Sequence, residues 1–178
     1  NIVFHGTFYV THSVGRRWIE AGLKGNIISI LATWVWTGSP YVVPSAMSKS
    51  AINAMTKSLA VEWGPYNIRV NAIAPGPFPT EGAWARLSPK GDLDNDSSYS
   101  TIPLGRVGEM SELQNLASFL MADGCDYLTG QTIAIDGAQY ITGGGTFSGL
   151  SKLKDSDWEE IKSMIKSTNE KDKANRNT

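Results

Sequence analysis

Three short runs of apolar and β-branched residues, each preceded by a stretch with helical spacing, constrain the fold more than any other feature. The runs are NIISIL at 26–31, IRVNAIAPG at 68–76 and TIAIDGA at 132–138. Each has the length and composition of a buried strand. Strands that alternate with helices pair in parallel through right-handed crossovers. The sequence therefore predicts an α/β fold built on an open, doubly wound parallel sheet.

Apolar residues at helical spacing precede and separate these runs. They predict helices at 4–21, 45–63 and 109–121, and a polar amphipathic helix near 155–167. Ser45 would cap the second helix and Ser111 the third, because serine side chains accept hydrogen bonds from free backbone amides at helix starts. The segments at 32–44 and 77–107 are predicted to be loops.

A glycine-rich run, TGGGTFSG at 142–149, predicts a flexible joint near the end of the chain. It divides the sequence into a main domain at 1–141 and a tail at 142–178. The tail consists of this linker and the last predicted helix.

Composition argues against several classes of partner. The formal net charge of −1 offers no general attraction for nucleic acid or for an anionic membrane surface. No apolar run reaches the ~20 residues needed to cross a bilayer. The single cysteine, Cys125, allows no internal disulfide and favours a reducing, cytoplasmic location. We therefore predict no nucleic-acid partner, no membrane partner and no metal site.

Several motifs, taken in order, carry a resemblance to a known family. GNIISI, PSAMSKSAINAMTKSLAVEWGPYNIRVNAIAPGP, IPLGRVGEMSELQNLASFLMAD and YLTGQTIAIDGAQ together resemble the second half of a short-chain dehydrogenase/reductase. GSPYVVPSAMSK and APGPFPTEGAWARL look most like the 2,4-dienoyl-CoA reductase branch. The resemblance covers about residues 1–140. It implies a Rossmann-type fold whose N-terminal part, with the glycine-rich phosphate loop, is missing from this sequence.

The resemblance also implies an activity. Members of this branch reduce the carbon–carbon double bond of an enoyl- or 2,4-dienoyl-CoA in fatty acid metabolism. We therefore expect an acyl-CoA substrate, NADP as cofactor with NAD not excluded, and a homo-oligomer, often a tetramer. The helices at 1–21 and 45–63 match the faces that pair subunits in the family.

Four residues match or replace the family's catalytic groups. Lys49 would bind the ribose hydroxyls of the nucleotide and lower the pKa of a neighbouring acid. Ser45 matches the serine of the branch, whose hydroxyl donates to the thioester carbonyl. The tyrosine acid of the branch falls on Trp34, and its asparagine falls on His5.

These replacements decide the expected chemistry. An indole N–H donates a hydrogen bond but delivers no proton near neutral pH, whereas histidine can deliver one. We therefore predict that His5 donates the proton and that Trp34 and Ser45 orient the substrate carbonyl. Tyr41 is a second, less suitable acid. Each residue also has a structural alternative. Lys49 would be a surface lysine and Ser45 a helix cap. His5 would be hydrogen-bonded to the backbone, and Trp34 would be a plain wall of the pocket.

Further residues are expected to bind the cofactor and the CoA group. Those matching the segment along the nicotinamide are Pro75, Gly76, Pro77, Phe78 and Thr80. Arg86 matches a basic residue that meets CoA, and its planar guanidinium suits phosphate. The alternative for the segment that begins at Pro75 is a tight turn after a strand, and the alternative for Arg86 is a solvated side chain. Asp136 and Gly137 are interpreted as a structural turn.

Two other functions stay open. A carbonyl reductase or alcohol dehydrogenase of the same fold would be expected to carry tyrosine at position 45. A truncated, non-catalytic remnant or pseudoenzyme would account for the replaced acids and the missing phosphate loop. It would act, if at all, as an interaction module, and it should have no affinity for NADPH.

Overall fold

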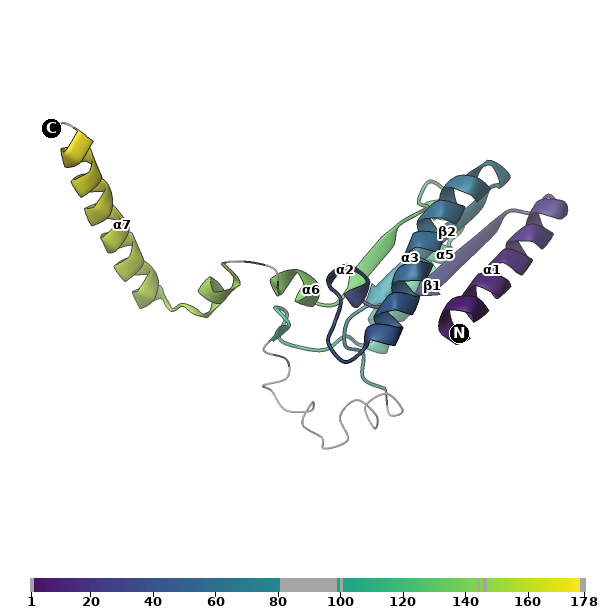
Figure 1. Ribbon diagram of the computed structural model, residues 1–178, viewed down its shortest axis with the longest axis horizontal. Helices are drawn as coiled ribbons and strands as arrows, with labels where there is room; N and C mark the ends of the chain where they lie inside the picture. The colour runs from purple at the N-terminus through teal and green to yellow at the C-terminus, as the bar shows by residue number, and fades with distance from the viewer. Residues whose placement is uncertain (1, 81–98, 100, 144, 146, 177–178) are drawn as a thin grey trace. The chain divides into compact units, whose positions relative to one another are not determined.

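The computed structural model describes residues 2–80, 99, 101–143, 145 and 147–176. These residues form two compact units, Asn1–Thr142 and Gly143–Thr178. The helices and strands of the first unit are α1 (Ile2–Glu20), β1 (Gly25–Ile30), α2 (Trp34–Thr37), α3 (Val43–Trp63), β2 (Ile68–Pro75), α5 (Met110–Met121), β3 (Thr132–Ile135) and α6 (Gln139–Thr142). Figure 1 shows their arrangement.

The described strands form one parallel sheet in the order β1-β2-β3. Ile27 of β1 pairs with Val70 of β2, and Ala72 of β2 pairs with Thr132 of β3. The central strand is the most buried: Ile68, Val70 and Ile73 are almost fully inaccessible to solvent. This sheet confirms the predicted α/β class and the parallel pairing.

Alternate residues of β2 point to opposite faces of the sheet, and each face has its own helices. The residues at positions 68, 70, 72 and 74 pack with side chains of α3 and with Trp18 and Ile19 of α1. Arg69, which points the other way, reaches the end of α5. The sheet is therefore covered on both sides, with α1 and α3 side by side on one face (Figure 1).

Two predicted helix caps are wrong. Helix α3 begins at Val43, with Val42 as N-cap and Pro44 in the first turn, so Ser45 lies inside the helix. Proline suits this position because the first helical amides need no intrahelical partner. Helix α5 is capped by Glu109, whose side chain and that of Glu112 bond each other's backbone amides in a capping box. Ser111 is therefore not the cap.

Other boundaries also differ from those predicted. The segment predicted as a loop at 32–44 contains the short helix α2. Strand β3 stops at Ile135, because the carboxylate of Asp136 accepts the backbone amides of Ala138 and Tyr140 and turns the chain into α6. This contact confirms the interpretation of Asp136 as a turn residue.

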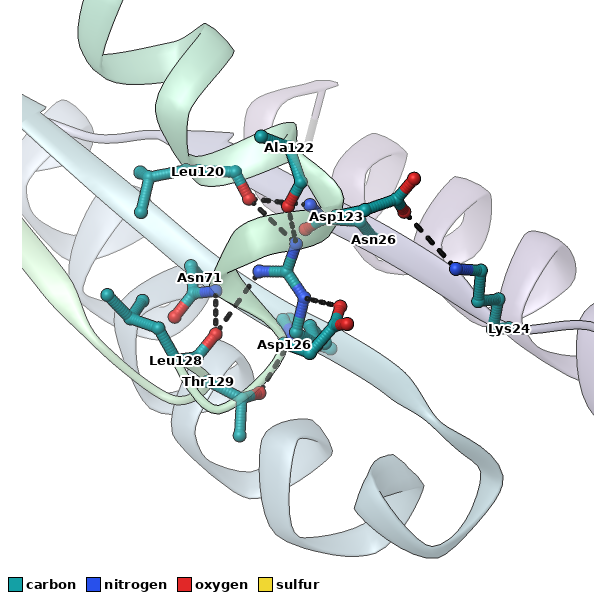
Figure 2. Close-up of polar contacts among 11 residues, drawn as sticks. Lys24, Asn26, Asn71, Leu120, Ala122, Asp123, Asp126, Leu128 and Thr129 are labelled. Atoms are coloured by element: carbon teal, nitrogen blue, oxygen red, sulfur yellow. Dashed lines mark hydrogen bonds and ion pairs between the residues drawn. The ribbon is translucent and has the colours of Figure 1, made fainter.

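The loop between α5 and β3 is fixed by buried polar groups near the start of β2 (Figure 2). Arg69 Nη2 donates to the carbonyl oxygens of Leu120 at 2.9 Å and Ala122 at 3.3 Å, and Nη1 donates to that of Leu128 at 3.2 Å. The side-chain amide of Asn71 donates to the same Leu128 oxygen at 2.9 Å. These bonds hold the loop that leads into β3 and so position the third strand.

The second unit contains a 3-10 turn at Ser148–Lys152 and the helix α7 (Asp155–Arg176). Helix α7 is longer than the predicted 155–167. Its start is fixed by Asp157, whose carboxylate accepts the backbone amide of Lys154 at 2.8 Å. Among the described residues, no helix combines the length and the apolarity needed to cross a membrane.

Candidate active site

Lys49 lies at the carboxyl end of β1. It belongs to the second turn of α3, and its Nζ donates a hydrogen bond to the carbonyl oxygen of Ile30, the last residue of the strand. The side chain is half-buried, and this burial lowers the pKa of the Lys49 ammonium below its ordinary value. An ammonium has three donors, so Lys49 can still donate to a ligand.

Trp34 stands four residues beyond Ile30, as the first residue of α2. Its indole N–H is buried, and it has no hydrogen-bond partner among the residues that the structure describes. The next residue, Val35, packs against the core cluster around Leu31 and Ile52, which anchors the short helix. Buried polar groups nearly always have a partner, so this indole N–H is suited to an acceptor on a ligand.

Ser45 precedes Lys49 by four residues on α3, so the two side chains lie on the same face of the helix. Its side chain is half-buried. Within the described part of the chain, the Ser45 hydroxyl has no hydrogen bond. The structure therefore leaves the Ser45 hydroxyl and part of the Lys49 ammonium available on one helix face near the end of β1.

His5 lies on α1 and is exposed. Its ring contacts Phe4 and Tyr9 of the same helix, with centroid distances of 4.9 Å and 6.1 Å. No described contact joins His5 to the three residues above.

Helices α1 and α3 run in parallel, and Gly15 lies directly against the ring of Trp63. A rise of about 1.5 Å per residue puts His5 roughly 15 Å before that contact and Lys49 roughly 21 Å before it. The two residues are therefore at similar levels on neighbouring helices.

The segment after β2 is held closely against the end of β3. The backbone amide of Gly76 donates to the carbonyl oxygen of Ile135 at 2.9 Å. A β-carbon at position 76 would stand only 2.6 Å from the Asp136 β-carbon, so the close packing of the two strand ends requires glycine here. Pro75, the last residue of β2, is half-buried.

The residues that follow turn across this edge of the sheet. The carbonyl oxygen of Pro77 accepts the amide of Gly108 at 3.0 Å, and the ring of Phe78 covers Gly108. A small cavity of about 70 Å³ lies here between the two segments, next to Asp136 and Gly137. Thr80 is exposed. Arg86 lies outside the described residues.

One contact at this edge was not predicted from the sequence. The rings of Trp36 and Tyr140 stack with a centroid distance of 4.7 Å and an interplanar angle of 29°. Trp36 belongs to α2, after β1, and Tyr140 belongs to α6, after β3. Nothing in the local sequence around either residue indicates the other. In the described part of the chain, no cluster of His, Cys, Asp or Glu could hold a metal ion.

Comparisons with known proteins show which chains this one resembles. Residues 1–138 match the family model described as enoyl-(acyl carrier protein) reductase. A probable 2,4-dienoyl-CoA reductase of Caenorhabditis elegans, which produces (3E)-enoyl-CoA, is 40% identical over 178 residues. The alignment covers 98% of this chain and 57% of the relative.

Solved structures are similar over the same part of the fold. A short chain dehydrogenase from Bacillus anthracis is 45% identical with a TM-score of 0.68, over 79% of this chain and 53% of the other. A putative 2-deoxy-d-gluconate 3-dehydrogenase from Agrobacterium tumefaciens, with bound NADP, is 27% identical with a TM-score of 0.73. That alignment covers 79% of this chain and 56% of the other.

The chain belongs to the short-chain dehydrogenase/reductase family, as its motifs predicted. It has the Rossmann-type fold of that family of oxidoreductases in part. It spans a little more than half the length of each of the three relatives described above.

Proposed function

We propose that this chain carries the substrate site of an NADP-dependent reductase that acts on the carbon–carbon double bond of an enoyl- or 2,4-dienoyl-CoA. The observation that carries the proposal is the buried indole N–H of Trp34, which lacks a described partner and lies just beyond the strand end where Lys49 is held. The name of the C. elegans relative supports the same substrate class.

In this proposal, the Trp34 indole and the Ser45 hydroxyl donate hydrogen bonds to the thioester carbonyl oxygen. Negative charge develops on that oxygen when the conjugated acyl chain accepts a hydride, so donors fixed in a half-buried site stabilise the transition state. The positive charge of Lys49 on the neighbouring turn adds to this effect. A bound nicotinamide nucleotide would supply the hydride.

Lys49 fits the ribose of such a nucleotide, since it is positioned by Ile30 and has further N–H groups to donate. We assign the nicotinamide side to the segment Pro75, Gly76, Pro77 and Phe78, with Thr80 beside it. NADP is proposed because the A. tumefaciens neighbour holds it, and NAD is the alternative. Arg86 would pair with phosphates of CoA.

His5 is the proposed proton donor. It is exposed on α1, so it can exchange its proton with solvent between turnovers. An imidazole nitrogen can hold a proton and release it to a reacting group, which suits a general acid. Replacing His5 by Asn should abolish turnover of the active enzyme, and unchanged turnover would remove His5 from the mechanism.

We also propose that the protein is a cytoplasmic homo-oligomer, with a tetramer as the expected form. The outer sides of α1 and α3 expose large apolar side chains, including Tyr9 (63%), Val10 (65%) and Met47 (69%). Exposed apolar patches of this kind often mark interfaces between proteins. Light scattering on the purified protein measures its mass in solution directly.

The experiment that tests the function is a reductase assay on the natural full-length protein with NADPH and 2,4-hexadienoyl-CoA. Trp34→Phe keeps an aromatic wall and removes the N–H, so kcat/KM should fall roughly 10²-fold. Trp158→Phe, on α7, is the matched control and should keep wild-type rates. Wild-type rates in the W34F enzyme would show that Trp34 only lines the pocket and donates no hydrogen bond in the reaction. Absence of both NADPH binding and turnover in the wild type would favour the non-catalytic remnant.

A further inference from the structure

The two helices at the carboxyl edge of the sheet are too short to be stable alone. Helices α2 and α6 have four residues each, and α2 has no side-chain cap. Isolated helices of this length do not persist in water. Forming the first turn fixes several backbone dihedral angles, and the loss of conformational entropy exceeds the gain from the hydrogen bonds of a single turn. Their conformations therefore depend on contacts with the rest of the unit.

Helix α6 is fixed by Asp136, which follows β3 directly. The Asp136 carboxylate is buried, and its two oxygens accept the backbone amides of Ala138 at 3.0 Å and Tyr140 at 2.7 Å. The hydroxyl of Thr142 donates back to the carbonyl oxygen of Ala138 at 2.9 Å. These bonds hold the backbone at Tyr140 in one place relative to the end of β3.

Helix α2 is fixed at successive residues. Val35 packs into the core, and Trp36 stacks on Tyr140. Residues two apart on a helix lie about 200° apart around its axis, so Trp34 and Trp36 point in nearly opposite directions. The stack therefore holds the side of α2 opposite Trp34, and the core holds the helix between them.

This arrangement spans the sheet. Strand β2 lies between β1 and β3. Because α2 follows β1 and α6 follows β3, the stacked rings of Trp36 and Tyr140 connect the two segments on either side of β2. A series of contacts therefore connects the two sides of the sheet. It runs from Asp136, after β3, through Tyr140 and Trp36 to α2, the helix after β1 that carries Trp34.

We propose that Tyr140 is a positioning residue, which holds the indole N–H of Trp34 at the substrate carbonyl through its stack on Trp36. The inference rests on the proposed function, since it takes Trp34 as the donor to that carbonyl. Tyr140 acts through its ring and touches no substrate. Phenylalanine at position 140 should therefore serve as well as tyrosine, whereas leucine should not.

The test reads the Trp34 N–H directly by nuclear magnetic resonance. The six tryptophans of the chain give indole ¹H–¹⁵N signals, and Trp34→Phe identifies the one from Trp34. Tyr140→Leu should move or broaden the Trp34 signal, while Tyr140→Phe leaves it in place. Tyr127→Leu is the matched control, because Tyr127 is fully exposed. A Trp34 signal that Tyr140→Leu leaves unmoved would overturn the proposal.

Two additions keep the test decisive. If Tyr140→Leu fails to fold, Trp36→Leu removes the stack from the other side and must displace the same signal, and an unmoved signal again overturns the inference. In the reductase assay, Tyr140→Leu should lower kcat at least 5-fold (about 1 kcal/mol), Tyr140→Phe should restore it, and KM for NADPH should not change. A protein that shows the displaced signal but has no reductase activity would refute the proposed function and leave the positioning contact intact.

Discussion

Gly76 lies against Asp136 so closely that a β-carbon at position 76 would come within 2.6 Å of the aspartate's β-carbon and 2.8 Å of its α-carbon. One of these atoms belongs to the backbone, so rotation of a side chain cannot relieve the contact. The glycine therefore joins two strand ends, β2 and β3, at the edge where the proposed nicotinamide segment begins. This need is structural and is separate from any contact with a cofactor.

Gly76→Ala should lower the free energy of unfolding by about 1–3 kcal/mol, as overpacking of a close contact usually does. Urea denaturation measures this change. Gly6→Ala is the matched control, because nothing lies within 4 Å of a β-carbon there and the residue lies inside helix α1. The control should be neutral or slightly stabilising. Equal stability of the two variants would contradict the packing argument.

Arg69 should contribute more to stability than any surface arginine. Its guanidinium is buried and donates to three backbone carbonyls, so Arg69→Met leaves those oxygens without this donor. We expect the free energy of unfolding to fall by about 3 kcal/mol. Arg16→Met removes an exposed pair with Glu20 and should lower the free energy of unfolding far less than Arg69→Met does. Denaturation of both variants under the same conditions gives the comparison, and equal losses would refute it.

The strands and long helices could be predicted from the sequence because their signals are local. The run at 68–76 is apolar with β-branched residues, and it forms the buried strand Ile68–Pro75. Cap residues were less predictable. Ser45 and Ser111 are good N-caps by residue type. The chain nevertheless uses Pro44 in the first turn of α3 and a reciprocal pair of glutamates at α5.

The candidate site could be predicted only in part for a related reason. Lys49 and Ser45 are one turn apart on one helix, so their common face follows from spacing alone. The unpartnered indole of Trp34 and the stack of Trp36 on Tyr140 depend on tertiary contacts between segments far apart in the sequence. The helices that present them are too short to leave a periodic pattern. The roles given to His5 and Arg86 remain predictions.

The contact between Arg106 and Glu112 should make stability depend on acidity. Arg106 donates two hydrogen bonds to the Glu112 carboxylate, at 2.7 Å and 2.8 Å. These bonds, together with one donated by the backbone amide of Glu109, lower the pKa of Glu112 to about 2. The lowered pKa means that this stabilisation is present above the unfolded value of 4.5 and is lost as the pH falls toward 2.

Glu112→Gln should therefore lower the melting temperature at pH 6 and flatten its decline between pH 4.5 and 2. Thermal unfolding followed by circular dichroism at several pH values measures both effects. Glu62→Gln, at an exposed glutamate of α3, is the control and should keep the wild-type profile. High salt should reduce the difference at pH 6, because the pair is exposed and screened. A Glu112→Gln profile parallel to that of the wild type would refute the assignment.

Lys49→Met should separate activity from stability. Burial lowers the pKa of Lys49, so the folded state holds its proton less tightly than the unfolded state. Between the lowered pKa and the unfolded value of 10.5, the unfolded chain binds more protons, and wild-type stability rises with pH. The variant lacks this rise, so its melting temperature relative to the wild type should fall as the pH increases toward 10.5. Half of the side chain is solvated, which limits the effect to about 1 kcal/mol or less. Lys57→Met, an exposed position on the same helix, should show no such trend.

In the reductase assay, Lys49→Met should abolish turnover at every pH, including those where it is as stable as the wild type. A variant that is stable and still active would show that Lys49 only fills the end of β1.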